Sequence, residues 1–487
     1  MNSSHAFDVV VVGAGPAGLG AARTAARLGF STLVIEQLAG PGELGHPCSA
    51  IIAPVPHTGL RQEGGLHFRK IDLTIPASLI RGYPMLQRWV GPGGHETATA
   101  LGGQRGSPAA AIDKAGLLRL LAGQAEAAGA VLRYGRTVTG LVGRNGRVTG
   151  VVVDGHEDIK AGVVLAAEGS TRWLCNRALP GTQRPGTRGQ VLVIGQEFEA
   201  PAVGPRHVGQ TIAFSPRDGM RPGRRAVGMA VAAAAGRLAL FLFVLGDDPE
   251  GIAATSAGGY LQQYLSENPR LGELCAGARP LPGHLAKVSR MAVASPSGQV
   301  VADGFMGLGD AIAPAGHLGI LPSLYLGRQA ALIAGEALEA GDTSAWRLAP
   351  YQRIFRQRFL PDLSTEAEAL VSLSHMSDAE VEAFCRSQGQ VARPVAANEP
   401  ASLATPGQPW RPHGTPAPFA GHARSLDWET VGSQSRATGA RRAAPALPAI
   451  AALWPARPLR GGLVRLWATG FATDVRAAMG ASWAQGN

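Results

Sequence analysis

The hydrophobic pattern at the start of the chain predicts a strand, a helix and a second strand. Residues 8–13 read D-V-V-V-V-G, an uninterrupted β-branched run that is typical of a strand buried on both faces. Small and apolar residues then recur at helical spacing over residues 19–28, and Gly29 ends that predicted helix. Residues 31–35 form the next apolar run. We therefore expect a βαβ unit that opens a parallel sheet.

Short apolar runs and helical stretches continue to alternate further along the chain. Residues 112–128 place leucines and alanines on one helical face, and Gly129 ends this predicted helix. The Asn-Gly pair at residues 145–146 predicts a type I′ hairpin between its flanking strands. A longer helix is expected over residues 320–340. Further strands are predicted over residues 131–142, 148–153, 161–167 and 304–308.

Other regions depart from this α/β pattern. Residues 190–283 are rich in strand patterns, with one helix expected near residues 260–265. Residues 346–388 have helical periodicity with a polar face. Residues 389–445 are low in apolar residues and rich in Pro, Ala, Gly and Ser, which predicts a disordered linker. Helical periodicity returns over residues 459–483.

Charge is unevenly distributed along the chain. The 487 residues are enough for two or three domains, and the formal net charge is +10. From Val391 onward there are ten arginines and four acidic residues, so this tail supplies +6 of the total. A solvated extension is the ordinary explanation for such a tail, and contact with an anionic membrane surface is the sharper alternative. No basic motif with interleaved aromatic residues is visible, so we expect no nucleic-acid partner.

The cysteines exclude several kinds of site. Cys48, Cys175, Cys275 and Cys385 form no C-x-x-C pair, which argues against zinc and iron–sulfur clusters. So few cysteines in so long a chain also argue against a disulfide framework. The sequence shows no secretory signal peptide and no apolar run long enough to span a membrane. We therefore expect a cytoplasmic protein, with peripheral membrane contact left open.

The turn after the first predicted strand carries a complete G-x-G-x-x-G motif. The first glycine permits the tight turn, the second lets the backbone approach a pyrophosphate, and the third lets the helix pack on the sheet. The helix start offers free N–H groups and the positive end of its dipole. Glu36 ends the second strand, where a carboxylate accepts hydrogen bonds from ribose hydroxyls. The residues of the motif are Gly13, Ala14, Gly15, Pro16, Ala17 and Gly18.

Two later strands end in similar glycine-bearing turns. Residues 163–170 read V-V-L-A-A-E-G-S, and residues 306–311 read M-G-L-G-D-A. Because the carboxyl ends of parallel strands meet at one sheet edge, the three turns should converge on one crevice. We therefore predict an α/β fold: a Rossmann-like βαβ domain with a central parallel sheet, an inserted mixed-β domain and a C-terminal helical or disordered extension.

Together, these fragments resemble the FAD-binding domain of the p-hydroxybenzoate-hydroxylase-type flavoproteins. The resemblance implies FAD as the cofactor. In that group a Gly-Asp pair, here Gly309 and Asp310, holds the ribityl chain. The next helix begins at Gly319 and Ile320, and in the group its N-terminus points at the flavin pyrimidine.

The same resemblance implies four further contacts with the cofactor. Glu168 precedes Gly169 where the group more often has an aspartate. Lys114 stands where the group usually has an arginine that contacts the cofactor. Val138 falls where the backbone of the group meets the adenine.

Within that group, the chain is similar to the geranylgeranyl reductases and the related FixC-type dehydrogenases. Residues 43–48 read E-L-G-H-P-C and match a segment of the form E-I-G-x-P-x-x-C, shortened before the cysteine. Residues 309–311, 318–320 and 327–331 match the later motifs G-D-A-A-G, E-G-I and S-G-R-x-A-A. Leu318 stands in place of the Glu of the second motif, and the loop before it is about three residues shorter than in the family. The aromatic Y-x-W-x-F-P motif of those reductases has no counterpart, and the apolar run at residues 241–245 stands in that part of the chain. Prenyl substrates are therefore left open.

Three side chains are candidates for proton transfer. The resemblance places Cys48 beside the flavin ring, where a thiol could steer substrate or donate a proton. A small hydrophobic residue that lines the pocket is the equal alternative. His46 and His317 flank the same predicted site and could donate a proton near neutral pH. Loop histidines held by backbone groups are their ordinary alternative.

The resemblance implies an FAD-dependent oxidoreductase that transfers hydride between flavin and a hydrophobic unsaturated, isoprenoid-like substrate. NAD(P)H or a reduced protein donor would supply the electrons. Two alternatives share the fold: an aromatic-ring monooxygenase that uses NAD(P)H and oxygen, and a FixC-like electron-transfer flavoprotein dehydrogenase.

These assignments predict a discontinuous domain organisation. The FAD-binding domain is expected to take residues 1–65, 101–180 and 290–340, and the substrate domain residues 66–100 and 181–289. A helical segment at residues 341–388, a disordered linker at 389–445 and an amphipathic C-terminal segment at 446–487 should follow.

Overall fold

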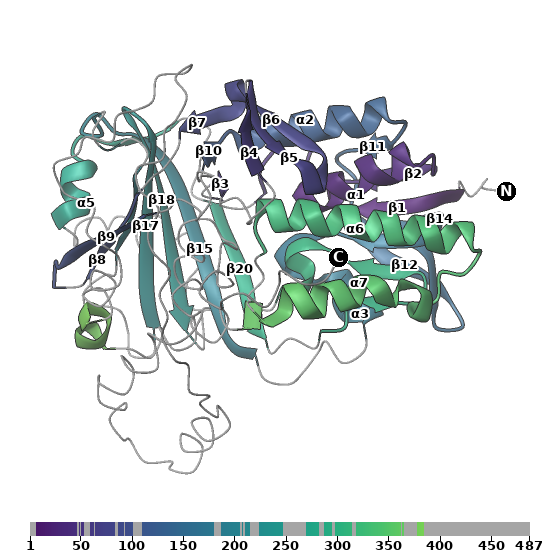
Figure 1. Cartoon of the computed structure of the whole chain (residues 1–487). Helices are drawn as coiled ribbons and strands as arrows, with labels where there is room; N and C mark the ends of the chain where they lie inside the picture. The colour runs from purple at the N-terminus through teal and green to yellow at the C-terminus, as the bar shows by residue number, and fades with distance from the viewer. Residues whose placement is uncertain are drawn as a thin grey trace, which may run out of the picture.

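The structure is a computed structural model, and it places two bodies side by side (Figure 1). The predicted helix near residues 260–265, the predicted linker at 389–445 and the predicted segment at 446–487 lie outside the described residues. The described residues are 6–45, 48, 50–52, 59–62, 64–82, 86–91, 93–100, 110–179, 187–204, 207, 210–214, 224–246, 269–281, 287–294, 298–313, 318–361, 363–364 and 377–383.

A mostly parallel sheet forms the first body. Its strand order is β11-β2-β1-β14-β13-β12, with β22 beside β14 and β21 beside β22. The pairs β11–β2, β2–β1, β1–β14 and β14–β22 are all parallel, which confirms the predicted Rossmann-like βαβ arrangement. The strands are β1 (Ala6–Val12), β2 (Thr32–Ile35), β11 (Val131–Arg133), β12 (Val138–Arg144), β13 (Arg147–Val153), β14 (Glu157–Ala166), β21 (Val301–Ala302) and β22 (Phe305–Gly307).

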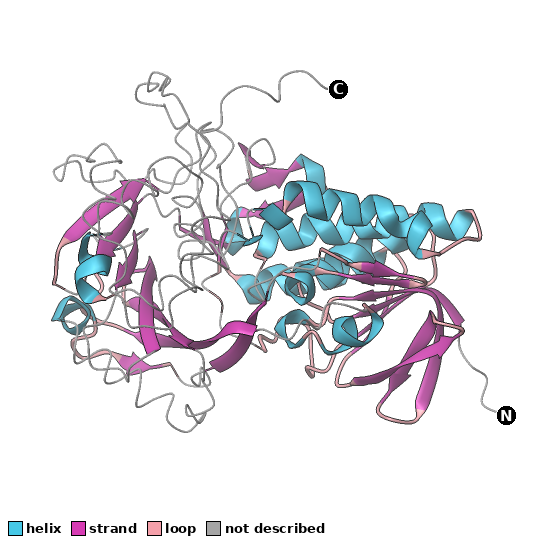
Figure 2. Cartoon of the chain, turned by 90° about the horizontal axis from the view of Figure 1, so that it is seen from below, coloured by secondary structure: helices cyan, strands magenta, loops and turns pink. Residues whose placement is uncertain are grey.

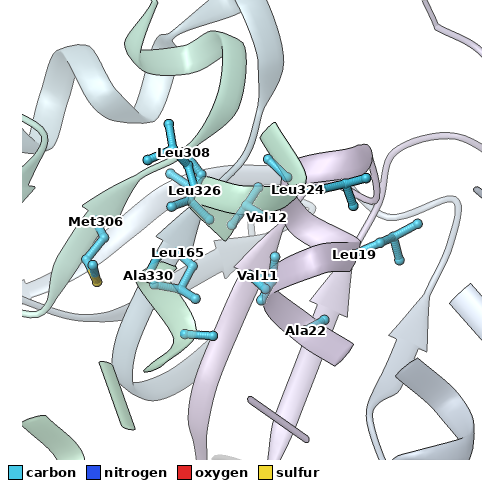
Figure 3. Packing of buried hydrophobic residues seen from close by; sticks show 14 of the residues in the cluster. Val11, Val12, Leu19, Ala22, Leu165, Met306, Leu308, Leu324, Leu326 and Ala330 are labelled. Carbon is cyan, nitrogen blue, oxygen red and sulfur yellow. The ribbon is translucent and has the colours of Figure 1, made fainter. Parts of the chain in front are cut away.

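Helices α1 (Pro16–Arg27) and α6 (Ile320–Glu339) pack closely against each other over this sheet. A Cβ at Gly327 would lie 2.2 Å from the Ala17 carbonyl oxygen, so only glycine allows this approach. Figure 3 shows part of the apolar cluster that these helices share with the strands, including Leu19 of α1 and Leu324 of α6. Burial of each such leucine stabilises the fold by about 1.5–3 kcal/mol relative to exposure. Helix α2 (Lys114–Ala127) packs against α1.

One predicted strand of this body is wrong in its extent. The strand expected over residues 131–142 is two strands, β11 and β12, because the chain turns between them at Gly135, whose φ is +66°. The predicted type I′ hairpin is confirmed, since Asn145 and Gly146 both have positive φ, at 51° and 77°. Gly29 and Gly129, which were expected to end two helices, lie at left-handed φ just past α1 and α2, and Gly341 does the same just past α6.

An antiparallel sheet forms most of the second body. Its order is β19-β15-β18-β17-β16-β8-β9, with β20 beside β15. Among the described strand pairs of this sheet, only β16–β8 is parallel. One face buries Ile194, Leu240 and Leu242 with Leu274 of helix α5 (Pro269–Leu274). The strands are β8 (Leu86–Val90), β9 (Glu96–Ala100), β15 (Thr187–Glu199), β16 (Gln210–Phe214), β17 (Arg224–Ala234), β18 (Arg237–Gly246), β19 (Arg279–Pro280) and β20 (Lys287–Ala294).

Two small sheets complete the described strands. One has the order β3-β10-β7 and the other the order β4-β5-β6. The hairpin of β5 and β6 buries Leu66, Phe68, Leu73 and Ile75 in the core of the first body. Their bounds are β3 (Ile51–Ile52), β4 (Gly59–Gln62), β5 (Gly65–Phe68), β6 (Leu73–Pro76), β7 (Ile80–Gly82) and β10 (Ala110–Ile112).

The predicted domain division remains a prediction, and two elements bear on its boundaries. Strands β8 and β9 join the second sheet, whereas the β5–β6 hairpin packs on the first body, although both fall in residues 66–100. Strand β20 pairs with β15 and runs across the expected boundary between residues 289 and 290. Figure 2 shows the larger helices gathered with the first body and the second sheet standing apart from them.

After α6, the chain passes from the first body to the second. Helix α7 (Ala345–Arg358) begins at Ser344, whose hydroxyl accepts the Arg347 N–H at 3.4 Å. Residues 377–383 then lie against the β8–β9 turn, because the Glu382 carboxylate accepts the N–H groups of Gly93 and His95 at 2.8 and 3.2 Å. Among the described helices, none is long and apolar enough to cross a membrane.

Candidate functional site

The three glycine-bearing turns lie side by side, as predicted. Strand β14 pairs with β1 on one side and with β22 on the other, so the three strands end at the same sheet edge. The Ala167 N–H donates to the Val12 carbonyl at 2.8 Å, which joins the second turn to the first. A Cβ at Gly309 would lie 2.9 Å from the Cβ of Ala17, which joins the third turn to α1. The three fragments therefore form one site.

The first turn needs its glycines for different reasons. Gly13 has φ +100°, and a Cβ there would lie 2.4 Å from the Ala167 carbonyl oxygen. A Cβ at Gly18 would lie 1.9 Å from the Gly13 carbonyl oxygen, so α1 can start here only with glycine. Gly15 differs, since apart from its neighbours along the chain no described atom lies within 4 Å of the position its Cβ would take. Gly15 begins α1 without a side-chain cap, and this open helix N-terminus suits a diphosphate.

Glu36 is held at the end of β2 by backbone donors. Its Oε2 accepts the Ala14 N–H at 2.6 Å, and its Oε1 accepts the Leu38 N–H at 2.9 Å. These bonds fix the carboxylate beside the first turn. A carboxylate has about four acceptor positions, so two remain for ribose hydroxyls.

Tyr134 is a residue that the sequence reasoning missed at this end of the site. It directly follows β11, whose Arg133 pairs with Ile35, so it is the neighbour of Glu36 across the parallel ladder. The Tyr134 hydroxyl is buried and has no hydrogen-bond partner among the described residues. Burial raises the pKa of Tyr134 to about 12, with smaller effects of Glu126 and Glu36 in the same direction. The phenol is therefore neutral near pH 7 and can donate a hydrogen bond. In the sequence, the only indication of this role is that Tyr134 follows a strand of the parallel sheet.

We expect Tyr134→Phe to weaken FAD binding while it stabilises the protein without cofactor. A hydrogen bond to the adenosine end of FAD would contribute about 1 kcal/mol, so the Kd should rise about fivefold. The same change removes a buried hydroxyl without a partner, so the melting temperature of the FAD-free protein should rise. Tyr325→Phe is the matched control, since that hydroxyl is bonded at 3.1 Å to Arg358. Equal FAD affinity in both variants would contradict the prediction.

The second turn is organised by Glu168. Its two carboxylate oxygens accept the N–H groups of Leu174 and Cys175, each at 2.8 Å, at the start of helix α3 (Trp173–Ala178). Burial raises the pKa of Glu168, and these N–H bonds oppose the rise. Gly169 follows with φ +73°. The Glu168 carboxylate is thus used by the protein itself, and direct contact of Glu168 or Gly169 with a cofactor stays a prediction.

The third turn positions the start of α6. The Asp310 Oδ1 accepts the Leu318 N–H at 2.7 Å, which closes the loop between them. Gly319 has φ +89° and precedes Ile320, the first residue of α6. Asp310 therefore fixes where the positive end of the α6 dipole lies, next to the turn that contacts α1.

Two other predicted cofactor contacts lie outside the three turns. Lys114 is the first residue of α2 and is 5% exposed, directly after Asp113, whose carboxylate accepts the Gly116 N–H at 3.0 Å. Val138 begins β12 and pairs with Val153. Contact of Lys114 and Val138 with the cofactor stays a prediction.

Of the three proton-transfer candidates, only Cys48 lies among the described residues; His46 and His317 lie outside them. Cys48 is half-buried and packs against the core of the first body. Its Sγ accepts the Ala50 N–H at 3.4 Å, and Ala50 has a left-handed φ of 53° just before β3. This geometry is compatible with both interpretations of Cys48, a thiol in the site and a small residue that packs in the core.

These features fit a bound FAD. The open space at Gly15 would take the diphosphate, and Glu36 and Tyr134 would meet the adenosine. The turn at Asp310 and the start of α6 would hold the ribityl chain and the flavin ring. When bound, FAD would supply a two-electron hydride donor and acceptor.

Comparison with known proteins agrees with this site. The family described as FAD dependent oxidoreductase matches residues 53–320, and the family described as NAD(P)-binding Rossmann-like domain matches residues 11–47. A digeranylgeranylglycerophospholipid reductase 2 from Methanopyrus kandleri is 27% identical over 392 residues, which are 78% of this chain and 89% of that protein.

Two solved structures share the fold. A geranylgeranyl bacteriochlorophyll reductase-like protein from Thermoplasma acidophilum matches with a TM-score of 0.65 and 19% identity, over 80% of this chain and 93% of that one. The halogenase PltM, solved with phloroglucinol and FAD, matches with a TM-score of 0.55 and 13% identity, over 78% of this chain and 79% of that one. With its motifs, its three-turn site and these matches, the chain belongs to the FAD-dependent oxidoreductase family, and its resemblance to the geranylgeranyl reductases is confirmed.

Proposed function

We propose that this protein is a reductase that transfers hydride from FAD to carbon–carbon double bonds of an isoprenoid lipid. The observation that carries the proposal is the similarity, over most of both chains, to relatives named as digeranylgeranylglycerophospholipid reductases. The three-turn site supports it, because it is built for FAD and lies at the sheet edge where ligands of such folds bind.

The second sheet supports a hydrophobic substrate. Leu240 and Leu242 of β18 point to the face that α5 covers, so Phe241 between them points to the opposite face. Phe243 lies on that opposite face with Phe241 and pairs with Val193, and Figure 1 shows α5 on the far side of the sheet from the first body. An apolar sheet face is thus turned toward the FAD-binding body.

The protein must supply one proton for each double bond that receives a hydride. Cys48 is proposed as a group at this step, with its Sγ held by the Ala50 N–H. His46 and His317 are proposed as alternatives on the predicted loops that flank the same site. Loss of reduction in Cys48→Ala, with retention in Cys48→Ser, would favour proton donation over packing.

Electrons are proposed to reach the FAD from NAD(P)H or from a reduced protein donor. Anaerobic mixing of the oxidised holoprotein with NADPH and with NADH distinguishes these sources, because bleaching of the flavin absorbance reports reduction. Bleaching by dithionite alone would favour a protein donor.

The experiment that tests the proposal uses the reduced holoprotein without oxygen. Mixing with a digeranylgeranylglycerol phospholipid in detergent micelles should reoxidise the flavin and add two hydrogens to the lipid for each double bond, as seen by mass spectrometry. The saturated lipid with the same headgroup is the control and should leave the flavin reduced. A flavin that stays reduced with the unsaturated lipid, and is reoxidised only when oxygen is then admitted, would overturn the proposal.

We also propose that the basic tail after Val391 contacts an anionic membrane surface. Its ten arginines outnumber its four acidic residues, and the substrate class proposed above resides in membranes. Sedimentation with vesicles that contain anionic lipid should retain the full chain and lose a variant that ends at residue 390. Equal sedimentation of both would contradict this role.

A further inference from the structure

Arg172 has an unusual backbone and an unusual side-chain environment. Its φ is +54°, a left-handed conformation that is uncommon for a residue other than glycine and costs on the order of 1 kcal/mol. It links the short 3-10 turn Gly169–Thr171 to helix α3. Such strain persists where the surrounding structure requires the side chain in one place.

The Arg172 guanidinium has few partners within the described structure. Its Nη1 donates to the Ala313 carbonyl at 3.4 Å, a long hydrogen bond. Its Nε is buried and has no hydrogen-bond partner among the described residues. Burial lowers the pKa of Arg172, with opposing effects of Cys175 and Glu168. A half-buried cation whose buried Nε has no acceptor costs free energy unless a further group meets it.

The charge of Glu168 acts on Arg172, but no ion pair joins the two side chains. Both oxygens of Glu168 already accept the N–H groups at the start of α3. Among the described residues, the ion pairs do not include Arg172. Within the described part of the chain, no carboxylate pairs with the guanidinium, so donors remain for a bound anion.

Arg172 lies between the second and third turns of the site. Ala313, its hydrogen-bond partner, follows Asp310 by three residues and precedes the N-terminus of α6. The 3-10 turn that ends at Thr171 also contacts strand β20 of the second sheet. This is the region that the fold gives to the ribityl chain and the flavin ring.

We propose that Arg172 is the cation that meets the negative charge of the reduced flavin ring. A positive group near the N1 and C2 carbonyl region of a flavin stabilises the reduced form over the oxidised form and raises its reduction potential. The role deepens the proposed function, since an isoprenoid reductase needs a reduced flavin that persists until the lipid binds. It depends on FAD binding and not on the identity of the lipid.

The test compares Arg172→Gln with Arg172→Lys in the holoprotein, and Arg177→Gln is the matched control. Arg177 lies on the same helix, is exposed, and stacks 3.4 Å above the Trp173 ring. The midpoint potential of the bound FAD is measured anaerobically against reference dyes, and sulfite affinity gives a second readout because the sulfite adduct also places negative charge on the ring. No lipid substrate is used, so failure of the reductase proposal leaves this result interpretable.

For Arg172→Gln we expect the reduced-to-oxidised equilibrium to fall at least tenfold, which is about 30 mV for a two-electron couple. The Kd for sulfite should rise at least tenfold, and Arg172→Lys should keep most of both values, as should Arg177→Gln. If Arg172→Gln loses FAD altogether, the potential of Arg172→Lys decides. A wild-type potential in Arg172→Lys supports the proposed role of the positive charge, and a lowered potential overturns the proposal. If Arg172→Gln weakens the binding of oxidised and reduced FAD equally, the cation contacts the diphosphate. If the potential is unchanged and the melting temperature falls, Arg172 only stabilises the fold. Either result overturns the proposal.

Discussion

Gly15→Ala is expected to weaken FAD binding about 100-fold and to leave the protein without cofactor as stable as the wild type. The φ of Gly15 is −75°, which alanine adopts freely, and apart from its neighbours along the chain no described atom lies within 4 Å of the added Cβ. The methyl group would instead occupy the open space at the start of α1, where the diphosphate must approach the backbone. Loss of charge-assisted hydrogen bonds there, each about 1.5–3 kcal/mol, should weaken binding about 100-fold.

The neighbouring glycine should behave differently. A Cβ at Gly18 would lie 1.9 Å from the Gly13 carbonyl oxygen, so Gly18→Ala strains the fold itself. We expect this variant to lose stability with or without FAD. The two substitutions, three residues apart, thus separate a glycine that the cofactor requires from one that the fold requires.

Isothermal titration of the FAD-free protein measures the affinity, and thermal unfolding measures the stability. Gly123→Ala is the control for glycine replacement as such, because Gly123 is exposed in the middle of α2 with open space at its Cβ. It should stabilise the protein by about 0.5–1 kcal/mol and leave FAD affinity unchanged. Wild-type FAD affinity in Gly15→Ala would show that the diphosphate lies elsewhere.

Local sequence signals were sufficient for the parts of the site that depend on the backbone. The motif Gly13–Gly18 and the Gly-Asp pair at Gly309 could be predicted because the fold requires glycine there. Only glycine fits the left-handed turn at Gly13 and the close contact of Gly309 with Ala17. The parallel sheet followed from strands of continuous apolar residues, and parallel strands must end at a common edge. The convergence of distant turns could therefore be predicted before any coordinates.

Features that depend on tertiary contacts could not be predicted in this way. The β5–β6 hairpin looks like any half-buried hairpin in sequence, and only packing shows that Phe68 belongs to the first body. Tyr134 and Arg172 belong to no local motif. They stand out only because the Tyr134 hydroxyl and the Arg172 Nε are buried without a hydrogen-bond partner among the described residues. The two bonds from the Glu168 carboxylate to the start of α3 could not be predicted either, because they depend on how the chain folds over Gly169–Thr171.

Arg23→Leu is expected to give the largest loss of stability among the substitutions considered. Arg23 lies on α1, is 4% exposed, and joins three separate elements. Its Nη1 donates to the Gln124 side chain of α2 at 2.6 Å. Its Nη2 donates to the carbonyls of Ile71 and Asp72 at 2.6 and 2.9 Å, next to the β5–β6 hairpin. Burial lowers the pKa of Arg23, because it disfavours the charged form. The hydrogen bonds to these acceptors offset this cost and keep the guanidinium charged.

Leucine fills much of the volume but leaves those acceptors without their donor, at about 1–3 kcal/mol for each buried group. We expect a total loss of about 3 kcal/mol, since the Arg23 Nε has no partner among the described residues and its removal offsets part of the cost. Arg27→Leu, one turn later on α1, is the control: its pair with Asp72 at 2.7 Å joins side chains that are 46% and 64% exposed. Such exposed pairs contribute about 0–1 kcal/mol.

Hydrogen–deuterium exchange distinguishes this brace from a general loss of packing. In Arg23→Leu, exchange should accelerate first in residues 65–76, because the hairpin loses its tie to α1 and α2, while β1 and β14 stay protected. Thermal unfolding should show a large fall in the melting temperature for Arg23→Leu and a small one for Arg27→Leu. If both variants lose the same stability, or if exchange rises evenly over the first body, Arg23 does not hold the hairpin, and the Phe68 cluster alone accounts for its position.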